Sequence, residues 1–189
     1  MQDKGKVIIV SGPSGVGKGT LLRELFACKE FPLVMSVSAT TRSPRPGERN
    51  GVDYDFLTTE EFERCLQEGL FLEHFKVFGG AHYGTLKEKV SQALAQGQWI
   101  VLEIDVKGAR EVLKSYPEAL TFFIMPPDEK TLLERLLHRG TETAESRAKR
   151  IKTAQLEMEQ RGLYQHIIVN DNLQDAVNEL IETLRKEKS

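Results

Sequence analysis

A glycine-rich loop between an apolar strand and an amphipathic helix constrains the fold of this chain more than any other feature. The apolar run Val7–Val10 leads directly into Ser11-Gly-Pro-Ser-Gly-Val-Gly-Lys-Gly-Thr20, and a helical pattern begins at Lys18. In this context the backbone N–H groups of the loop and the helix N-terminus form a cradle for phosphate, to which Lys18 adds a positive charge. The sequence therefore predicts a site for nucleotide phosphates, formed by Gly12, Pro13, Ser14, Gly15, Val16, Gly17, Lys18, Gly19 and Thr20. The alternative is a turn that only joins strand and helix, which fits poorly with so many matching positions.

The alternation of apolar strands and amphipathic helices predicts an α/β fold, with a parallel sheet as its core and helices on both faces. Strands are expected over Lys6–Val10, Leu33–Ser38, Trp99–Ile104, Leu120–Met125 and His166–Val169. Helices are expected over Lys18–Cys28, Thr59–Glu68, Leu86–Gln96, Lys107–Ser115, Asp128–Arg139, Ser146–Arg161 and Leu173–Lys186. Residues 40–57, which end in a strand-like run at Tyr54–Leu57, and a second strand-like run further on at Phe71–Phe78 indicate a small inserted lobe. The polar residues 139–146 indicate a mobile surface loop. A length of 189 residues fits a single domain with these two additions.

The composition excludes several classes of partner. The chain has 26 basic and 28 acidic side chains and a formal net charge of −2, so we expect no nucleic-acid partner. Its longest apolar runs are strand-sized and far shorter than the ~20 residues that span a bilayer, so we expect no membrane partner. Cys28 and Cys65 lack the spacing of metal ligands and suit a reducing, cytoplasmic location.

One position of the loop departs from the general pattern. Gly19 stands where many phosphate loops carry the Ser or Thr that binds Mg²⁺, and Thr20 follows one residue later. On a helix, one residue corresponds to a rotation of ~100°. We therefore expect no direct protein ligand for Mg²⁺, and expect the ion to be bound through phosphates and water.

A second group of residues suits another phosphorylated ligand. Arg42 and Arg45 are three residues apart on a proline-rich segment, which places them on one side of an extended helix with three residues per turn. Guanidinium groups bind phosphate in a bidentate manner, and the hydroxyl groups of Tyr54 and Tyr83 could complete such a site. The alternative for the two arginines alone is a solvated loop.

Acidic residues on two of the expected strands are candidates for binding a base or Mg²⁺. Period-two alternation places Glu73 on the apolar face of its strand, where a carboxylate needs a partner such as two neighbouring N–H donors. The alternative for Glu73 is an edge-strand charge that faces water. Glu103 and Asp105 lie on one face at the carboxyl end of a strand, where open parallel sheets bind ligands. They could contact a nucleotide amine or water on Mg²⁺, and Asp105 could also cap the next helix.

Several segments together resemble the guanylate kinase family over nearly the whole chain. They are Gly12–Thr20, Ser38–Glu48, Gly51–Phe56, Tyr83–Thr85, Glu103–Asp105 with Gly108, Arg139–Thr143 and Ile168–Asp171. The resemblance implies ATP-dependent, reversible phosphorylation of GMP, and of dGMP, with Mg²⁺ as cofactor, in purine nucleotide metabolism and GMP recycling. It also implies a phosphate loop at residues 12–20, a GMP-binding lobe at about 36–86 and a lid at about 139–150.

The same resemblance implies roles for individual residues. The GMP site would comprise Ser38, Arg42, Arg45, Tyr54, Glu73, Tyr83, Thr85, Glu103 and Asp105, although the family often has Asp where this chain has Glu103. Asn170 would lie near the adenine of ATP. The catalytic residues would be Lys18, Arg42, Arg135, Arg139 and Arg150, and the last three would close over the ATP phosphates.

Two other functions remain open from the sequence. One is a protein-interaction module of the same fold without turnover, against which the presence of Lys18 and the arginines argues. The other is a phosphate-loop kinase for another small phosphorylated acceptor, against which Glu73 and Ser38 argue, because carboxylate and hydroxyl groups match the edge of guanine.

Overall fold

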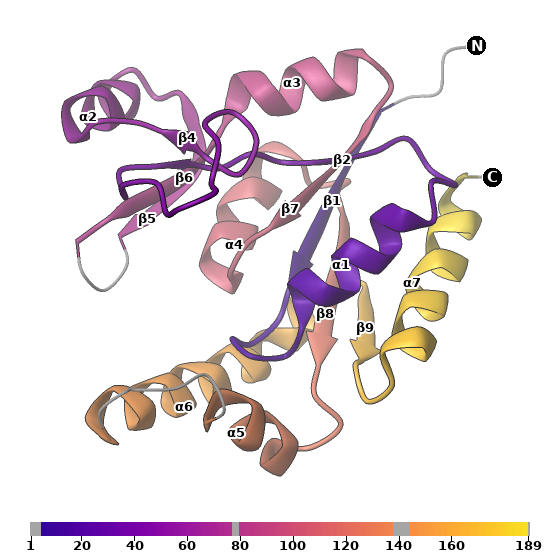
Figure 1. The fold of residues 1–189 in the computed structure, drawn as a ribbon. Helices are drawn as coiled ribbons and strands as arrows, with labels where there is room; N and C mark the ends of the chain where they lie inside the picture. The colour runs from indigo at the N-terminus through magenta and orange to yellow at the C-terminus, as the bar shows by residue number, and fades with distance from the viewer. Residues whose placement is uncertain (1–4, 77–79, 138–143, 189) are drawn as a thin grey trace. The chain divides into compact units, whose positions relative to one another are not determined.

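The chain is an α/β protein with a parallel five-stranded sheet and a smaller four-stranded sheet, flanked by helices (Figure 1). The computed structural model describes the backbone of residues 5–76, 80–137 and 144–188, and their side chains except at residues 137 and 144–150. The strand order is β2-β7-β1-β8-β9 in the larger sheet and β4-β3-β6-β5 in the smaller one. The chain forms two compact units, of which the first comprises Met1–Ile8, Pro32–Leu102 and Lys107–Ala119. The second comprises Ile9–Phe31, Glu103–Val106 and Leu120–Ser189.

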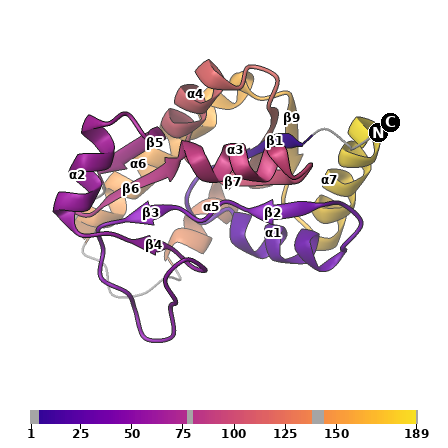
Figure 2. The same ribbon diagram turned by 90° about the horizontal axis from the view of Figure 1, so that it is seen from above.

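The first unit contains the smaller sheet and an apolar cluster beneath it. In this sheet β5 and β6 are antiparallel, and β3 pairs in parallel with β4 (Figure 2). Ala39, Phe62 and Phe71 form the core of the cluster, and the rings of the two phenylalanines are stacked. The elements are the start of β1 (Lys6–Ser11), β2 (Leu33–Met35), β3 (Ala39–Thr40), β4 (Asp55–Phe56), α2 (Thr59–Gln67), β5 (Phe71–Lys76), β6 (His82–Leu86), α3 (Lys87–Ala95), β7 (Trp99–Glu103) except its last residue and α4 (Val106–Ser115) except its first.

The second unit contains the glycine-rich loop and the C-terminal half of the chain. Strands β8 and β9 pair in parallel, and helices α1 and α7 lie side by side (Figure 1). Leu132 and Leu136 of α5 pack with Ala154 of α6 in a separate apolar cluster. The elements are the end of β1 (Lys6–Ser11), α1 (Lys18–Ala27), β8 (Leu120–Met125), α5 (Glu129–Leu137), α6 (Ala144–Glu159), the 3₁₀ helix η1 (Gln160–Leu163), β9 (His166–Val169) and α7 (Leu173–Lys188).

The predicted strands and helices are confirmed to within a few residues, with two exceptions. The strand expected over Leu33–Ser38 ends at Met35. Ser36 N still donates a hydrogen bond to Val101 O at 2.9 Å, and the chain then continues into the smaller sheet. Strands β3 and β6 were not predicted. Strand β3 has two residues, and β6 contains Gly84, whose added Cβ would lie 2.8 Å from a ring carbon of Phe71. A glycine required by close packing weakens the sequence signal of a strand.

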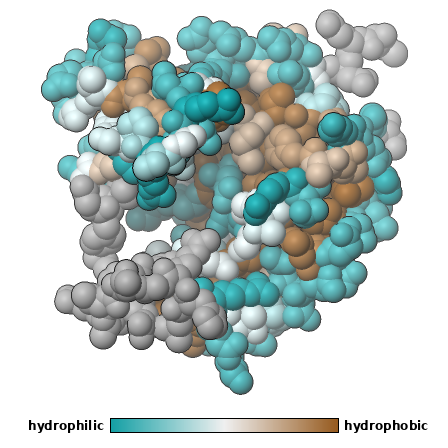
Figure 3. Space-filling view, viewed as in Figure 1, coloured by the Kyte–Doolittle hydropathy of each residue, from teal (hydrophilic) through white to brown (hydrophobic). Residues whose placement is uncertain are grey.

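Polar side chains cover much of the face shown in Figure 3, with hydrophobic patches between them. Within the described part of the chain, no helix combines the length and the apolar character that a membrane span requires.

Candidate nucleotide-binding site

The phosphate loop lies between β1 and α1 in the second unit, and Gly12, Gly15 and Gly17 in it have backbone conformations that other residues rarely adopt. Gly12 has φ 145°, and an added Cβ would collide with the carbonyl oxygen of Ile124. Gly17 has φ 96°, and an added Cβ would lie 2.7 Å from Asn170 Nδ2. Both positions therefore require glycine, for conformation as well as for space.

The side chain of Lys18 crosses the loop from the first turn of α1. Its Nζ donates hydrogen bonds to the carbonyl oxygens of Gly12 at 2.6 Å and Pro13 at 3.2 Å. The loop thus holds the ammonium group beside its own backbone, at the helix N-terminus where phosphate oxygens bind in loops of this type. The role of Lys18 in binding phosphate stays a prediction.

Two predicted site residues support the loop from the outside. Asn170, which is 6% exposed, donates from Nδ2 to the Val16 carbonyl oxygen at 2.8 Å. Arg135 of α5 donates to the Asn170 carbonyl oxygen at 3.1 Å and makes a longer contact of 3.5 Å with the Val16 carbonyl. Both residues therefore contact the loop or its immediate support. The contact of Asn170 with adenine stays a prediction.

Carboxylates near the loop make it suitable for hydrated Mg²⁺. Glu103 Oε2 lies 4.0 Å from the Cβ position of Gly19, and Asp105 lies close enough to Glu157 of α6 to affect its pKa. Among the described residues, no group of three His, Cys, Asp or Glu side chains is arranged to bind a metal directly. Carboxylates that accept hydrogen bonds from bound water fit an ion that keeps much of its hydration shell. Whether Glu103 and Asp105 contact a nucleotide amine or water on Mg²⁺ stays a prediction.

In the first unit, Glu73 lies on the buried side of strand β5. Glu73 is 3% exposed. The alternative interpretation, an edge-strand charge that faces water, is therefore wrong, although β5 is an edge strand. Thr85 of β6 donates from Oγ1 to Glu73 Oε1 at 2.7 Å. The other carboxylate oxygen, Oε2, lies 3.1 Å from the position that a Cβ on Gly108 would occupy. The structure therefore brings two of the predicted base-binding residues together and adds Gly108 as their neighbour.

Arg42 and Tyr83 also come together in the first unit, around a residue to which the sequence analysis gave no role. Arg42 donates from Nη1 and Nη2 to the two carboxylate oxygens of Glu48, each at 2.9 Å, and from Nε to Tyr83 Oη at 3.1 Å. The Glu48 carboxylate raises the pKa of Arg42, and the Arg42 guanidinium lowers the pKa of Glu48. The guanidinium carbon also lies 5.2 Å from the ring centroid of Tyr54. Together with a hydrogen bond from Nη1 to the Ser43 carbonyl oxygen at 2.7 Å, these contacts occupy most of the guanidinium N–H donors and fix its orientation.

Arg45 and Ser38 also belong to the first unit. Arg45 begins a turn in which the Glu48 N–H donates to the Arg45 carbonyl at 3.0 Å, with Gly47 at φ 91°. The Arg45 N–H in turn donates to Glu48 Oε2 at 2.7 Å. The Ser38 carbonyl accepts a hydrogen bond from Asp55 N at 2.9 Å. Glu48 therefore holds the Arg42 side chain and the Arg45 backbone in place. The sequence contains one signal for such a role, an acidic residue directly after Pro46-Gly47.

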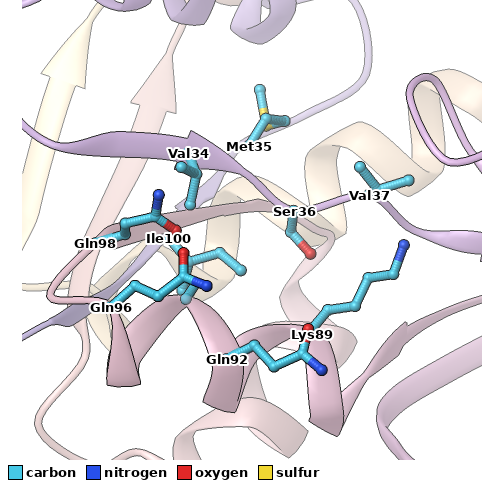
Figure 4. Close-up of a pocket in the computed structure, with 10 residues that line it drawn as sticks. Val34, Met35, Ser36, Val37, Lys89, Gln92, Gln96, Gln98 and Ile100 are labelled. Carbon is cyan, nitrogen blue, oxygen red and sulfur yellow. The ribbon is translucent and has the colours of Figure 1, made fainter.

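A groove of about 220 Å³ in the first unit lies between β2 and α3 and includes none of the predicted site residues (Figure 4). Val34, Ser36 and Ile100 form part of its wall, and the amide side chains of Gln92 and Gln96 lie on its helix side. Lys89 forms an ion pair with Asp55. This groove is therefore distinct from the positions of Glu73 and Arg42.

Some predictions fall outside the described residues. Arg139 and the first part of the expected lid lie in residues 138–143, and Arg150 lies in helix α6 at a position whose side chain is not described. Glu157 is the opposite case, because burial raises its pKa and the charges of Lys18 and Asp105 also affect it, but it was not predicted. It is one of many charged residues on its helix, and no spacing in the sequence distinguishes it.

Comparisons with known proteins identify the family. The family model for guanylate kinase matches residues 4–187. Guanylate kinase from Carboxydothermus hydrogenoformans is 47% identical over 186 residues, which cover 98% of this chain and 90% of the relative. That from Clostridium tetani is 44% identical over 186 residues, with coverage of 98% and 88%. The crystal structure of guanylate kinase from Anaplasma phagocytophilum superposes with a TM-score of 0.75 at 31% identity and covers 100% of this chain and 88% of that one. The chain therefore belongs to the guanylate kinase family.

Proposed function

We propose that this enzyme transfers the γ-phosphoryl group of ATP to GMP, with the acceptor bound by the first unit and the donor by the second. Membership of the guanylate kinase family supports this activity directly. The observation that carries the choice of acceptor is the burial of the Glu73 carboxylate with Thr85 as its neighbour.

Glu73 and Thr85 would recognise the guanine base. Guanine presents two adjacent donors, N1–H and the 2-amino group, which one carboxylate can accept together. The hydroxyl group of Ser38 can donate to the guanine O6 atom, whereas Thr85 uses its single hydroxyl proton to hold the Glu73 carboxylate. Adenine has an acceptor at N1 and lacks the 2-amino group, so the same site would disfavour AMP.

Arg42, Arg45, Tyr54 and Tyr83 would bind the phosphate of GMP. The bidentate pairing with Glu48 holds Arg42 in one orientation and supports this assignment, because a positioned guanidinium loses less conformational freedom when phosphate binds. The acceptor phosphate is already ionised, so the reaction needs no general base.

In the second unit, the phosphate loop and Lys18 would bind the β- and γ-phosphates of ATP. Mg²⁺, bound through phosphates and water near Glu103 and Asp105, would supply positive charge for the transferring phosphoryl group. Arg135 would add charge from α5, and we further propose that Arg139 and Arg150 do so when the lid closes, which also excludes water from the reaction. The substrates of this reaction suit a cytoplasmic location, and that location remains our proposal.

A coupled assay of ADP release tests the proposal. The wild-type protein is to be compared with GMP, dGMP, AMP, CMP and UMP as acceptors, each with ATP and Mg²⁺. We expect turnover with GMP and dGMP and far less with the other three. Equal turnover with AMP would refute the role of Glu73, and the absence of turnover with every acceptor would refute the enzymatic function.

A further inference from the structure

Ser11 ends strand β1 directly before the phosphate loop, and its side chain is completely buried. Its hydroxyl group donates from Oγ to the carbonyl oxygen of Ile104 at 2.8 Å, across 93 positions of the sequence. Both residues belong to the second unit. Ile104 lies between Glu103 and Asp105. The bond therefore joins the start of the loop to the segment that carries these two carboxylates.

Packing alone does not account for a hydroxyl group at this position. The preceding residues of β1, Val7–Val10, are apolar and buried. A hydroxyl group in such an interior costs free energy unless it forms a hydrogen bond, and alanine would fill most of the same space without that cost. The hydrogen bond to Ile104 is therefore the feature that Ser11 adds to the strand.

This hydrogen bond completes the attachment of Ile104 to β1. The Ile104 N–H donates to the Val10 carbonyl oxygen at 3.3 Å, and the Ile104 carbonyl accepts from Ser11. The side chain of Ile104 is 6% exposed, so it is packed in the interior. Strand β7 ends at Glu103, one residue earlier, so the side chain of Ser11 extends the link between the two strands beyond the end of β7. Both polar backbone groups and the side chain of Ile104 are thus fixed.

Fixing Ile104 also fixes where its two neighbours project. Successive side chains of an extended chain point to opposite sides, so inward packing of Ile104 directs Glu103 and Asp105 outward. Glu103 is exposed and Asp105 is half-buried. Glu103 Oε2 lies 4.0 Å from the Cβ position of Gly19, in the first turn of α1. The segment with the two carboxylates is therefore held beside the start of the helix that follows the loop.

We propose that Ser11 is a positioning residue of the donor site, which holds Glu103 and Asp105 at the distance from the phosphate loop that hydrated Mg²⁺ on ATP requires. The role rests on the proposed function of the loop in binding ATP. Ser11 acts through the backbone of Ile104 and touches neither ATP nor Mg²⁺, because its hydroxyl group is buried and its proton is used in the bond. Carboxylates that accept hydrogen bonds from water on an ion contribute only when the ion is present. The effect of Ser11 is therefore confined to ATP that carries Mg²⁺.

Ser11→Ala tests this role by calorimetric titration, which needs neither an acceptor nor turnover. The variant and the wild type are titrated with ATP in the presence of Mg²⁺ and, separately, with ATP in excess EDTA. Loss of one buried hydrogen bond changes an equilibrium constant by about 3- to 10-fold. We expect the dissociation constant for ATP with Mg²⁺ to rise by that factor, and the constant for metal-free ATP to stay within about twofold of the wild type.

Thr121→Ala is the matched control. Thr121 is 2% exposed and lies in the same unit, and its Oγ1 accepts from the Gln165 N–H at 2.9 Å. It is the second residue of β8, at the amino end of the strand, whereas the phosphate loop follows the carboxyl end of β1. Both variants lose one buried hydroxyl group from the sheet, so both should fold with a lower Tm. Thr121→Ala should nevertheless change neither dissociation constant, because its hydrogen bond does not reach the loop.

A double-mutant cycle shows whether Ser11 acts through the two carboxylates. In a protein that carries Glu103→Gln and Asp105→Asn, the further change Ser11→Ala should affect binding of ATP with Mg²⁺ less than it does in the wild type, because the groups that it positions have lost their charge. The inference is overturned if Ser11→Ala binds ATP with Mg²⁺ as the wild type does, if metal-free ATP loses as much affinity, or if the full effect persists in the cycle. Wild-type protein that does not bind ATP with Mg²⁺ at all would instead overturn the proposed function of the loop.

Discussion

The two units are equipped to bind a nucleotide in different ways. In the first unit, the predicted GMP-binding groups are side chains that contact one another, as Glu73 does with Thr85 and Arg42 with Tyr83. In the second unit, the predicted ATP-binding groups are mainly backbone N–H groups of a glycine-rich loop, which side chains from outside the loop support.

This difference separates selectivity from general phosphate binding. Backbone N–H groups recognise phosphate and carry no information about the base. Paired side chains present a fixed pattern of donors and acceptors and can distinguish one base from another. Substitutions in the first unit should therefore change which nucleotide is accepted, and substitutions in the second should change how well any phosphoryl donor is used.

The largest expected effect comes from Lys18→Ala in the second unit. The ammonium group acts on the phosphates of ATP, and removal of one such charged donor lowers kcat by roughly 10²- to 10³-fold or more. GMP binding, measured by calorimetry, and the circular dichroism spectrum should remain close to those of the wild type. Unchanged turnover would contradict the assignment of the loop to the donor.

The next effect in size is expected from Glu73→Gln in the first unit. The amide places an NH₂ donor opposite a donor of guanine, and such a mismatch costs ~1–3 kcal/mol, or roughly 5- to 150-fold in kcat/KM for GMP. The KM for ATP should stay unchanged, and AMP should improve relative to GMP, because the amide can donate to adenine N1. Steady-state kinetics with both acceptors at saturating ATP measure this. Glu63→Gln, at an exposed position of α2, serves as the control. Wild-type efficiency with GMP would show that Glu73 does not read the base.

The two units also differ in how far the sequence predicts them. The loop from Gly12 to Thr20 is contiguous, and its geometry follows from glycines and an adjacent helix, so local sequence is sufficient. The burial of Glu73 was predicted from period-two alternation, again a local pattern. The paired strands around it could not be predicted as readily, because β3 has two residues and β6 depends on the space beside Gly84.

Residues that act across long sequence separations escaped the sequence analysis. Glu157 is far from Lys18 and Asp105 in the chain, and nothing in the sequence indicates that their charges affect its pKa. The contact of Asn170 with Val16 is similar, since the resemblance indicated an adenine contact and the structure shows a hydrogen bond to the loop. Such pairs depend on how strands order within a sheet, which composition and periodicity do not determine.

A smaller effect is expected from Glu48→Gln, which tests whether the arginine of the first unit is positioned in advance. Gln has one acceptor oxygen instead of two and has no charge, so Arg42 loses its bidentate carboxylate partner. We expect the KM for GMP to rise about 3- to 10-fold, as for loss of one charge-assisted hydrogen bond near the surface, with kcat and the KM for ATP little changed. Glu60→Gln, at an exposed position of α2, is the control. A lower KM for GMP would mean that Glu48 competes with the phosphate for Arg42.

The smallest effect is expected from Gly108→Ala, which tests how closely the first unit fits the base-binding carboxylate. Gly108 is the third residue of α4, and an added Cβ would lie 3.1 Å from Glu73 Oε2. The carboxylate must then move by a few tenths of an ångström, which lengthens its hydrogen bonds to guanine. We expect kcat/KM for GMP to fall about 2- to 5-fold, or ~0.4–1 kcal/mol, with an unchanged KM for ATP.

Stability should respond to the same substitution in the opposite direction. Alanine is preferred over glycine in a helix by roughly 0.5–1 kcal/mol, which offsets the crowding near Glu73. Thermal unfolding should therefore give a Tm equal to or above that of the wild type, although the enzyme uses GMP less well. Gly162→Ala is the matched control, because no atom lies within 4 Å of its Cβ position and it belongs to the second unit. If Gly108→Ala used GMP as well as the wild type, the Glu73 carboxylate would have room to adjust, and base selectivity would depend on its charge and not on a fixed position.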